Sequence, residues 1–218
     1  MRATRNRVTL VAAVYVLLGW TWASSATGQA PNDVWHLDPA HTAAHFAVRH
    51  LGISTVRGTF SKVSGEVKYS PSSPTQASVE VTIDAASIDT GVAMRDNDVR
   101  GAHFLEVAKY PTMTFKSKAV EAGGAGKLRV TGDLTLHGVT KEVVLDVEGP
   151  SAPVKAMGGT HLGASATTKI MRSDFGMTAM QGMIGDEIDI VIDADLVDRL
   201  MGPPPGQGRP PQGPPPAQ

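Results

Sequence analysis

The chain contains 218 residues, with 20 Lys and Arg, 21 Asp and Glu, and a formal net charge of −1. This balance excludes the global positive field with which most nucleic-acid-binding proteins attract their partner. Apolar residues make up 41% of the chain, enough for a folded core. The absence of Cys excludes disulfides, Cys-ligated metal centres and thiol nucleophiles.

The first 29 residues have the composition of a secretory signal peptide. Arg2, Arg5 and Arg7 precede an apolar run over residues 8–23, after which small and polar residues follow. This order of basic, apolar and small-residue regions is typical of a cleavable leader. A permanent membrane anchor is the alternative, but the apolar run is shorter than the roughly 20 residues that a spanning helix needs. We therefore expect a signal peptide over 1–29 and a periplasmic or secreted protein.

Beyond the leader, apolar and polar residues alternate with the period of two that predicts half-buried β-strands. In chain order, the predicted strands cover residues 45–49, 56–60, 65–69, 78–84, 113–115, 127–136, 143–147, 162–170 and 187–196. We expect 56–60 and 65–69 to form a hairpin around 61–64. Turn residues separate the other runs. Eight or nine strands with one apolar face predict an antiparallel sheet that closes on itself.

One long segment interrupts this alternation. Residues 92–107 lack the period-two pattern, so we expect a loop there with a short helix near 95–106. Pro111 marks the return to strand, because the residue before a proline is biased towards extended backbone. As the one long insertion between strands, this segment is the natural cap for the mouth of a barrel.

Small residues occupy many positions on the inward face of the predicted strands. These are Gly58, Gly65, Ala119, Gly132, Ala164, Ala166 and Ala194. An eight-stranded barrel has an interior that side chains can just fill, or that can hold one small ligand. Small inward residues either leave such a cavity or accommodate bulges and the taper of the barrel. Composition and periodicity leave both interpretations open.

The chain ends in a low-complexity segment. Residues 202–218 consist only of Pro, Gly, Gln, Ala and one Arg, so we expect a disordered tail with polyproline II character. This tail is either a docking element for a partner or a neutral extension. The predicted barrel domain, residues 33–201, carries 16 Lys and Arg against 21 Asp and Glu. An acidic domain of this kind argues against nucleic acid as a partner.

Short motifs follow one another across about 34–198 in a specific order and spacing. They are His50-Leu51-Gly52, Gly58-Thr59-Phe60, Ser87-Ile88-Asp89-Thr90-Gly91, Arg95-Asp96, Phe104-Leu105, Tyr110-Pro111, Thr114-Phe115, the run from Gly132 to Lys141, and Arg172-Ser173-Asp174-Phe175-Gly176. Together they resemble the YceI-like family. The resemblance implies an all-β fold, an eight-stranded antiparallel lipocalin-like barrel with a helical insertion. It also implies a periplasmic or secreted protein that binds an isoprenoid or similar long apolar chain inside the barrel.

The predicted function is therefore non-catalytic carriage of a long-chain apolar lipid of quinone or prenol type, with no other cofactor. The residues expected to line the ligand site are Phe46, Val48, Phe60, Val81, Ile83, Phe115, Leu134, Leu136, Phe175 and Ile190. Core packing is the alternative for each of them. We expect Phe104 and Leu105 to close the mouth. Contacts to a polar head group are expected from His50, Arg95, Asp96, Arg100 or Asp174. Arg95 and Asp96 could instead form a structural ion pair or start the helix.

Two polar clusters raise the question of a metal ion. Four histidines crowd one stretch: His36, His41, His45 and His50. Strand parity argues against a shared site, because His45 and His50 point to opposite faces of a regular strand. The last strand carries an acidic row: Glu187, Asp189, Asp193 and Asp195. We expect this row to be a solvated outer face, paired with residues such as Lys169 or Arg172. No metal site is predicted.

Two other function classes stay open. A secreted hydrolase could assemble a Ser-His-Asp triad in space, although the sequence contains no G-x-S-x-G elbow, P-loop or dinucleotide fingerprint. A non-catalytic stress or interaction module could use the Pro-rich tail to hold a partner. A homodimer of two barrels also stays open.

Overall fold

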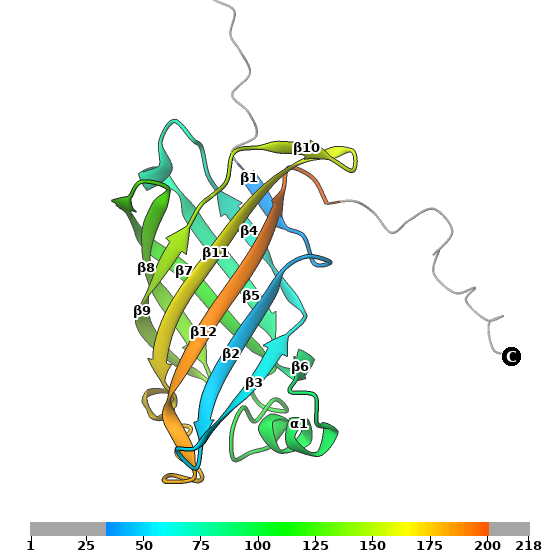
Figure 1. Cartoon of the computed structure of the whole chain (residues 1–218), viewed down its shortest axis with the longest axis vertical. Coiled ribbons are helices and arrows are strands. Elements are labelled where there is room, and N and C mark those ends of the chain that lie inside the picture. Colours follow the sequence, from blue (N-terminus) through cyan, green and yellow to red (C-terminus); the bar gives the residue numbers. More distant parts are fainter. Residues whose placement is uncertain (1–33, 201–218) are drawn as a thin grey trace, which may run out of the picture. The chain divides into compact units, whose positions relative to one another are not determined.

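The alternation of apolar and polar residues produces a sheet of twelve strands in the computed structural model, which describes residues 34–200 (Figure 1). The elements in chain order are β1 (Val34–Leu37), β2 (Ala43–His50), β3 (Ser54–Phe60), β4 (Val63–Lys68), β5 (Ser78–Asp84), β6 (Ile88–Asp89), α1 (Ala93–Arg100), β7 (Thr112–Gly124), β8 (Lys127–Leu136), β9 (Val139–Glu148), β10 (Val154–Ala156), β11 (Gly159–Met171) and β12 (Ile184–Val197). Short 3-10 turns are η1 (Pro74–Gln76), η2 (Ala85–Ser87) and η3 (Arg172–Phe175). The predicted leader and Pro-rich tail lie outside the described residues.

These strands form a closed barrel, because three pairs of them are pieces of longer strands. β1 and β2 run in the same direction along one edge of β12, with Leu37 opposite Leu196 and Ala43 opposite Asp193. β4 and β3 pair with β1 and β2 in turn, and β6 extends β5 by pairing with β3. Around the barrel the order is β1/β2, β3/β4, β5/β6, β7, β8, β9, β11 and β12, with antiparallel neighbours throughout. The prediction of an eight-stranded antiparallel barrel is confirmed.

Two local predictions are wrong. The segments 56–60 and 65–69 do not form a hairpin, because β3 and β4 run in the same direction and each pairs with a different part of the first strand. The helix covers Ala93–Arg100 and not 95–106. It ends at Gly101, where the chain folds back so that the Leu105 amide donates to the Val99 carbonyl at 2.9 Å.

The two ends of the barrel differ. We call the end that carries α1 the helix end; it also holds the turn at 51–53 and the loop 172–183 (Figure 1). The opposite, terminal end holds the start of β1 and the end of β12, which are paired through His36 and Val197. Buried apolar side chains cluster near both ends, around Phe175 at the helix end and Trp35 at the terminal end. Among residues 34–200, no helix is long and apolar enough to cross a membrane.

Five of the seven small residues that were expected on the inward face fall into two groups. A Cβ atom on Gly58 would lie 2.5 Å from the ring of Phe46, and one on Gly132 would lie 2.5 Å from the ring of Phe115. These glycines therefore make room for aromatic rings from adjacent strands and leave no empty space. Ala164, Ala166 and Ala194 line an internal cavity, which is described below.

Ala119 was expected on the inward face, but it is exposed. The register of β7 against β8 shifts between Ser117 and Ala119, and this β-bulge reverses the parity of the residues that follow. Val120 is consequently the residue that faces the core, with 8% of its surface exposed.

We predict that Gly132→Ala destabilises the barrel by about 1–3 kcal/mol, because the added methyl group meets a ring and a backbone carbonyl that cannot both move. The Lys116 carbonyl oxygen would lie 2.5 Å from the new Cβ atom. Gly163→Ala is the matched control, since its nearest neighbour, Ser151 Oγ, would lie 3.9 Å away. Urea unfolding measures the free energy of unfolding of both variants. Equal unfolding midpoints for the two would contradict this account of Gly132.

Candidate functional site

The barrel encloses a cavity of about 590 Å³. This volume falls within the roughly 300–1,000 Å³ that is usual for pockets of small ligands. Aliphatic and aromatic side chains dominate the wall, and they come from every strand of the closed barrel. The polar residues that contribute to the lining are His45, His50, Thr90, Arg95, Asp98, Thr114, Thr168 and Arg172. The interior is thus suited to an apolar ligand with a small polar group.

The strand period explains how the wall is built. On β12, Ile188, Ile190 and Ile192 line the cavity, while the residues between them face outward. On the adjacent strand β11, Ala164 pairs with Ala194 and Ala166 pairs with Ile192. Because these side chains are short, they extend only a little way into the interior, and space remains in the middle of the barrel.

The structure brings together nearly all of the residues expected to bind a ligand. Those that line the cavity are Phe46, Val48, His50, Phe60, Val81, Ile83, Arg95, Phe104, Leu105, Phe115, Leu134, Leu136 and Ile190. Phe175 is the exception, because it lies in η3 and packs in the core with 1% of its surface exposed. Strand parity does not apply in a 3-10 turn, and a buried Phe there looks the same in sequence as one on a strand.

At the helix end the cavity reaches the protein surface. Val92, Met94 and Met180 line the cavity and are 44%, 76% and 50% exposed. Lining residues at the terminal end, such as Tyr69, Leu128 and Pro150, are only partly exposed. The segment that follows α1 covers part of the opening, since Phe104 and Leu105 also line the cavity. The insertion therefore caps the mouth, as its position in the chain indicates.

Arg95 and Asp96 do not form an ion pair but converge on Thr90, which precedes α1. Arg95 donates through Nε to Thr90 Oγ1 at 2.8 Å and through Nη2 to the Thr90 carbonyl at 2.8 Å. Asp96 Oδ1 accepts from the Thr90 amide at 2.8 Å and from its hydroxyl. The Thr90 hydroxyl and amide together hold the pKa of Asp96 below its ordinary value, against the opposing effect of burial. Asp96 therefore has a structural role at the start of the helix.

Two other residues considered for a polar head group do not line the cavity. Arg100 donates to the backbone carbonyls of Ala86 and Ile88 at 3.0 and 2.6 Å, and so ties α1 to η2 and β6. Asp174 is exposed on η3. Of the five candidates, only His50 and Arg95 lie in the wall of the cavity.

The loops at the helix end are held by two residues whose roles the sequence does not reveal. Arg172, 3% exposed, donates to the carbonyls of Met177, Ile184 and Gly185 at 2.6, 3.1 and 3.0 Å. His137 bonds through Nδ1 to the Phe175 carbonyl at 3.0 Å, and its ring packs edge-on against Tyr110. Both residues satisfy buried carbonyl groups and so fix the loops that surround the mouth.

The prediction that residues such as Lys169 or Arg172 pair with the outer acids of β12 is confirmed for Lys169 and not for Arg172. The Lys169 Nζ lies 2.7 Å from Glu187 Oε1 and 3.0 Å from Asp189 Oδ1. Arg172 is the first residue of η3, directly after β11, and its side chain turns inward, where it donates to three carbonyls.

Comparison with known proteins agrees with this barrel. The YceI-like domain family matches residues 35–196. The chain belongs to the YceI-like family. Protein YceI of Salmonella agona is 37% identical over 187 residues, which cover 84% of this chain and 97% of that protein.

Solved structures show the same fold as this YceI-like barrel. The crystal structure of Burkholderia cenocepacia BcnA superimposes with a TM-score of 0.64 at 27% identity, over 73% of this chain and 98% of that one. A polyisoprenoid binding domain from Saccharophagus degradans, implicated in plant cell wall breakdown, superimposes with a TM-score of 0.55 at 18% identity. That match covers 75% of this chain and 97% of the other, and at this identity it shows the fold alone.

We predict that the cap region loses stability in acid because of Asp96. Its pKa in the folded protein lies below the ordinary value of 3.8, so the carboxylate stabilises the fold above pH 3.8 and this contribution disappears as the pH falls through the lowered pKa. Asp96→Asn should flatten this part of the dependence of unfolding free energy on pH, measured by urea unfolding between about pH 6 and pH 2. Glu121→Gln, at an exposed position on β7, is the control. An unchanged pH dependence in Asp96→Asn would show that the carboxylate has no such role.

Proposed function

We propose that this YceI-like protein binds a long-chain apolar lipid of isoprenoid type, such as a quinone or prenol, and carries it through an aqueous compartment. The enclosed apolar cavity of about 590 Å³ carries this proposal. Burial of apolar surface contributes about 25 cal/mol per Å², so a chain that buries about 400 Å² gains about 10 kcal/mol. Ordering of the chain and loss of its free motion oppose this gain. Affinity in the micromolar range or better is the expected net result.

The route of entry follows from the exposure of the wall. A ligand enters at the helix end, where Val92, Met94 and Met180 connect the surface to the interior. The apolar chain then lies along the alanine-lined side of β11 and β12. Its polar head stays near His50 and Arg95 at the mouth. Two nitrogens of Arg95, Nε and Nη2, are engaged with Thr90, so Nη1 is the nitrogen proposed to donate to a head-group acceptor.

The proposed role is transfer without catalysis. The two arginines in the lining have structural partners: Arg172 binds three carbonyls and Arg95 binds Thr90. The predicted leader supports a periplasmic or secreted location, in which a long apolar chain needs a protein to shield it from water. A polyisoprenoid binding domain has the same fold, and the choice of an isoprenoid as the ligand rests on this analogy of fold. A homodimer and a partner for the tail remain predictions.

Mass spectrometry tests the proposal directly. The protein is purified from its native host without detergent, extracted with organic solvent, and the extract is analysed for lipids. We expect about one quinone, prenol or related long-chain lipid for each chain. An empty extract, combined with no binding of prenyl lipids to the purified protein, would refute the carrier function.

A second test fills the cavity from one wall. Ala166→Phe places an aromatic ring in the interior and should weaken binding of a prenyl lipid at least about tenfold, because the ring occupies ligand volume. Thr167→Phe is the matched control, since the next residue of the same strand is exposed on the outer face. Fluorescence displacement measures affinity, and thermal unfolding confirms that both variants fold. Equal affinities for the two variants would place the ligand outside the barrel.

A further inference from the structure

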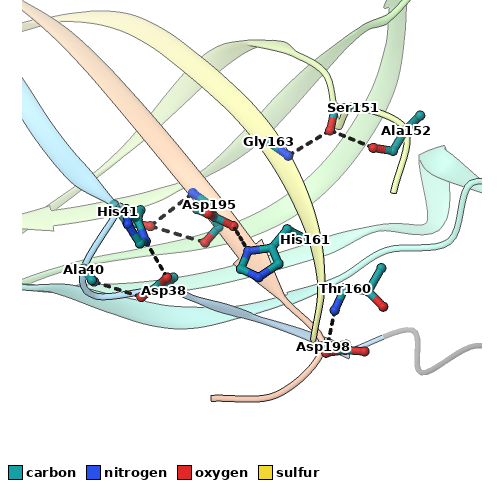
Figure 2. Close-up of polar contacts among 11 residues, drawn as sticks. Asp38, Ala40, His41, Ser151, Ala152, Thr160, His161, Gly163, Asp195 and Asp198 are labelled. Atoms are coloured by element: carbon teal, nitrogen blue, oxygen red, sulfur yellow. Dashed lines mark hydrogen bonds and ion pairs between the residues drawn. The ribbon is translucent and has the colours of Figure 1, made fainter. Parts of the chain in front are cut away.

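A cluster of imidazole and carboxylate groups lies on the outer surface of the barrel, near the terminal end (Figure 2). One donor atom from each of Asp38, His41 and Asp195 lies within 4.8 Å of the other two. Asp38 and His41 belong to the loop 38–42, which joins β1 to β2, whereas Asp195 belongs to β12. Asp195 faces outward because its neighbours Ala194 and Leu196 line the cavity. The cluster is thus separate from the ligand cavity.

Hydrogen bonds from backbone amides hold this loop against β12. The Asp38 amide donates to the Asp195 carbonyl at 2.8 Å, and the Asp195 amide donates to Thr42 Oγ1 at 3.2 Å. Thr42 is 3% exposed, and its buried hydroxyl fixes the end of the loop to β12. The Ala40 amide donates to Asp38 Oδ1 at 2.9 Å, which fixes the orientation of that carboxylate. The donor atoms are therefore positioned in advance and not by chance contact of mobile side chains.

The neighbouring strand β11 supplies a fourth group. His161 Nδ1 lies 2.9 Å from Asp195 Oδ1, and the His161 side chain is 15% exposed. Figure 2 shows that this imidazole approaches Asp195 from the side opposite to His41. A hydrogen bond of this kind orients a carboxylate that binds a metal ion, and such supporting groups change metal affinity about 10–100-fold.

Two carboxylates that converge repel each other, and here each has one imidazole at hydrogen-bond distance, His41 for Asp38 and His161 for Asp195. The Asp38 and His41 pair is 2.7 Å apart and would be complete without Asp195. A divalent ion placed between the three donor atoms would neutralise both carboxylates at once. Side-chain exposures of 20% for Asp38 and 53% for His41 leave this position open to solvent, so an ion can enter and keep bound water.

We propose that Asp38, His41 and Asp195 bind a divalent transition-metal ion of the Zn²⁺ type, with His161 as the residue that positions Asp195. A mixed nitrogen and oxygen donor set suits Zn²⁺ better than Mg²⁺ or Ca²⁺, which prefer oxygen alone. Three protein ligands leave one position for water or an external ligand. Because the three residues come from the β1–β2 joint and from β12, the ion links two strands at the seam where the barrel closes.

Zinc titration of the full chain tests this proposal. The protein is purified without a polyhistidine tag, treated with a chelator and dialysed, and Zn²⁺ binding is measured by calorimetry. We expect one Zn²⁺ per chain, and a rise in Tm of about 5–10 °C when zinc exceeds its Kd about 100-fold. His41→Ala and Asp195→Asn should each weaken binding at least about tenfold, and His161→Ala should weaken it by a similar factor through its effect on Asp195.

His36→Ala is the matched control, because His36 also lies at the terminal end and its Nδ1 is 3.4 Å from a single carboxylate, that of Glu66. This variant should bind zinc as the parent protein does. Co²⁺ in place of Zn²⁺ should give a visible absorption spectrum that His41→Ala abolishes. Less than half an equivalent of Zn²⁺ bound at about 100 µM free metal would overturn the proposal, and so would unchanged affinity in His41→Ala.

Discussion

Closure of the sheet is the constraint on which the rest of this structure depends. β12 is hydrogen-bonded along one edge to β11 and along the other to β1 and β2, so the first and last strands of the barrel are adjacent. A chain without Cys cannot hold such a seam with a disulfide, and backbone hydrogen bonds must do so. Closure leaves the barrel wall with few exposed strand edges. It also encloses an interior that is lined mainly by apolar side chains.

The interior is a compromise between packing and space. Aromatic rings at Phe46 and Phe115 are accommodated by glycines on adjacent strands, and this close packing stabilises the wall. Alanines on β11 and β12 do the opposite, because their short side chains leave volume that no neighbour occupies. Both types of small residue look the same in a sequence pattern. Their effects differ because one type faces a ring and the other faces the centre of the barrel.

Much of this fold and of the candidate site could be predicted from the sequence. Burial of one face imposes the period of two, so strands such as β8 and β12 and nearly all lining residues follow from parity. The hairpin at 56–69 was wrong because local alternation carries no information about which strand is the partner. Ala119 was misplaced by a bulge, and Phe175 lies in a turn where parity has no meaning. The convergence of Asp38, His41 and Asp195 depends on residues more than 150 positions apart, and only closure of the barrel brings them together.

The described chain begins at residue 34 and ends at residue 200, and both positions lie at the end opposite the mouth, as the pairing of His36 with Val197 requires. The exposed residues that line the opening, such as Met94 and Met180, therefore lie at the other end of the barrel from these two positions. In the proposed function, the ligand would thus pass in and out at the end of the barrel where the described residues neither begin nor end.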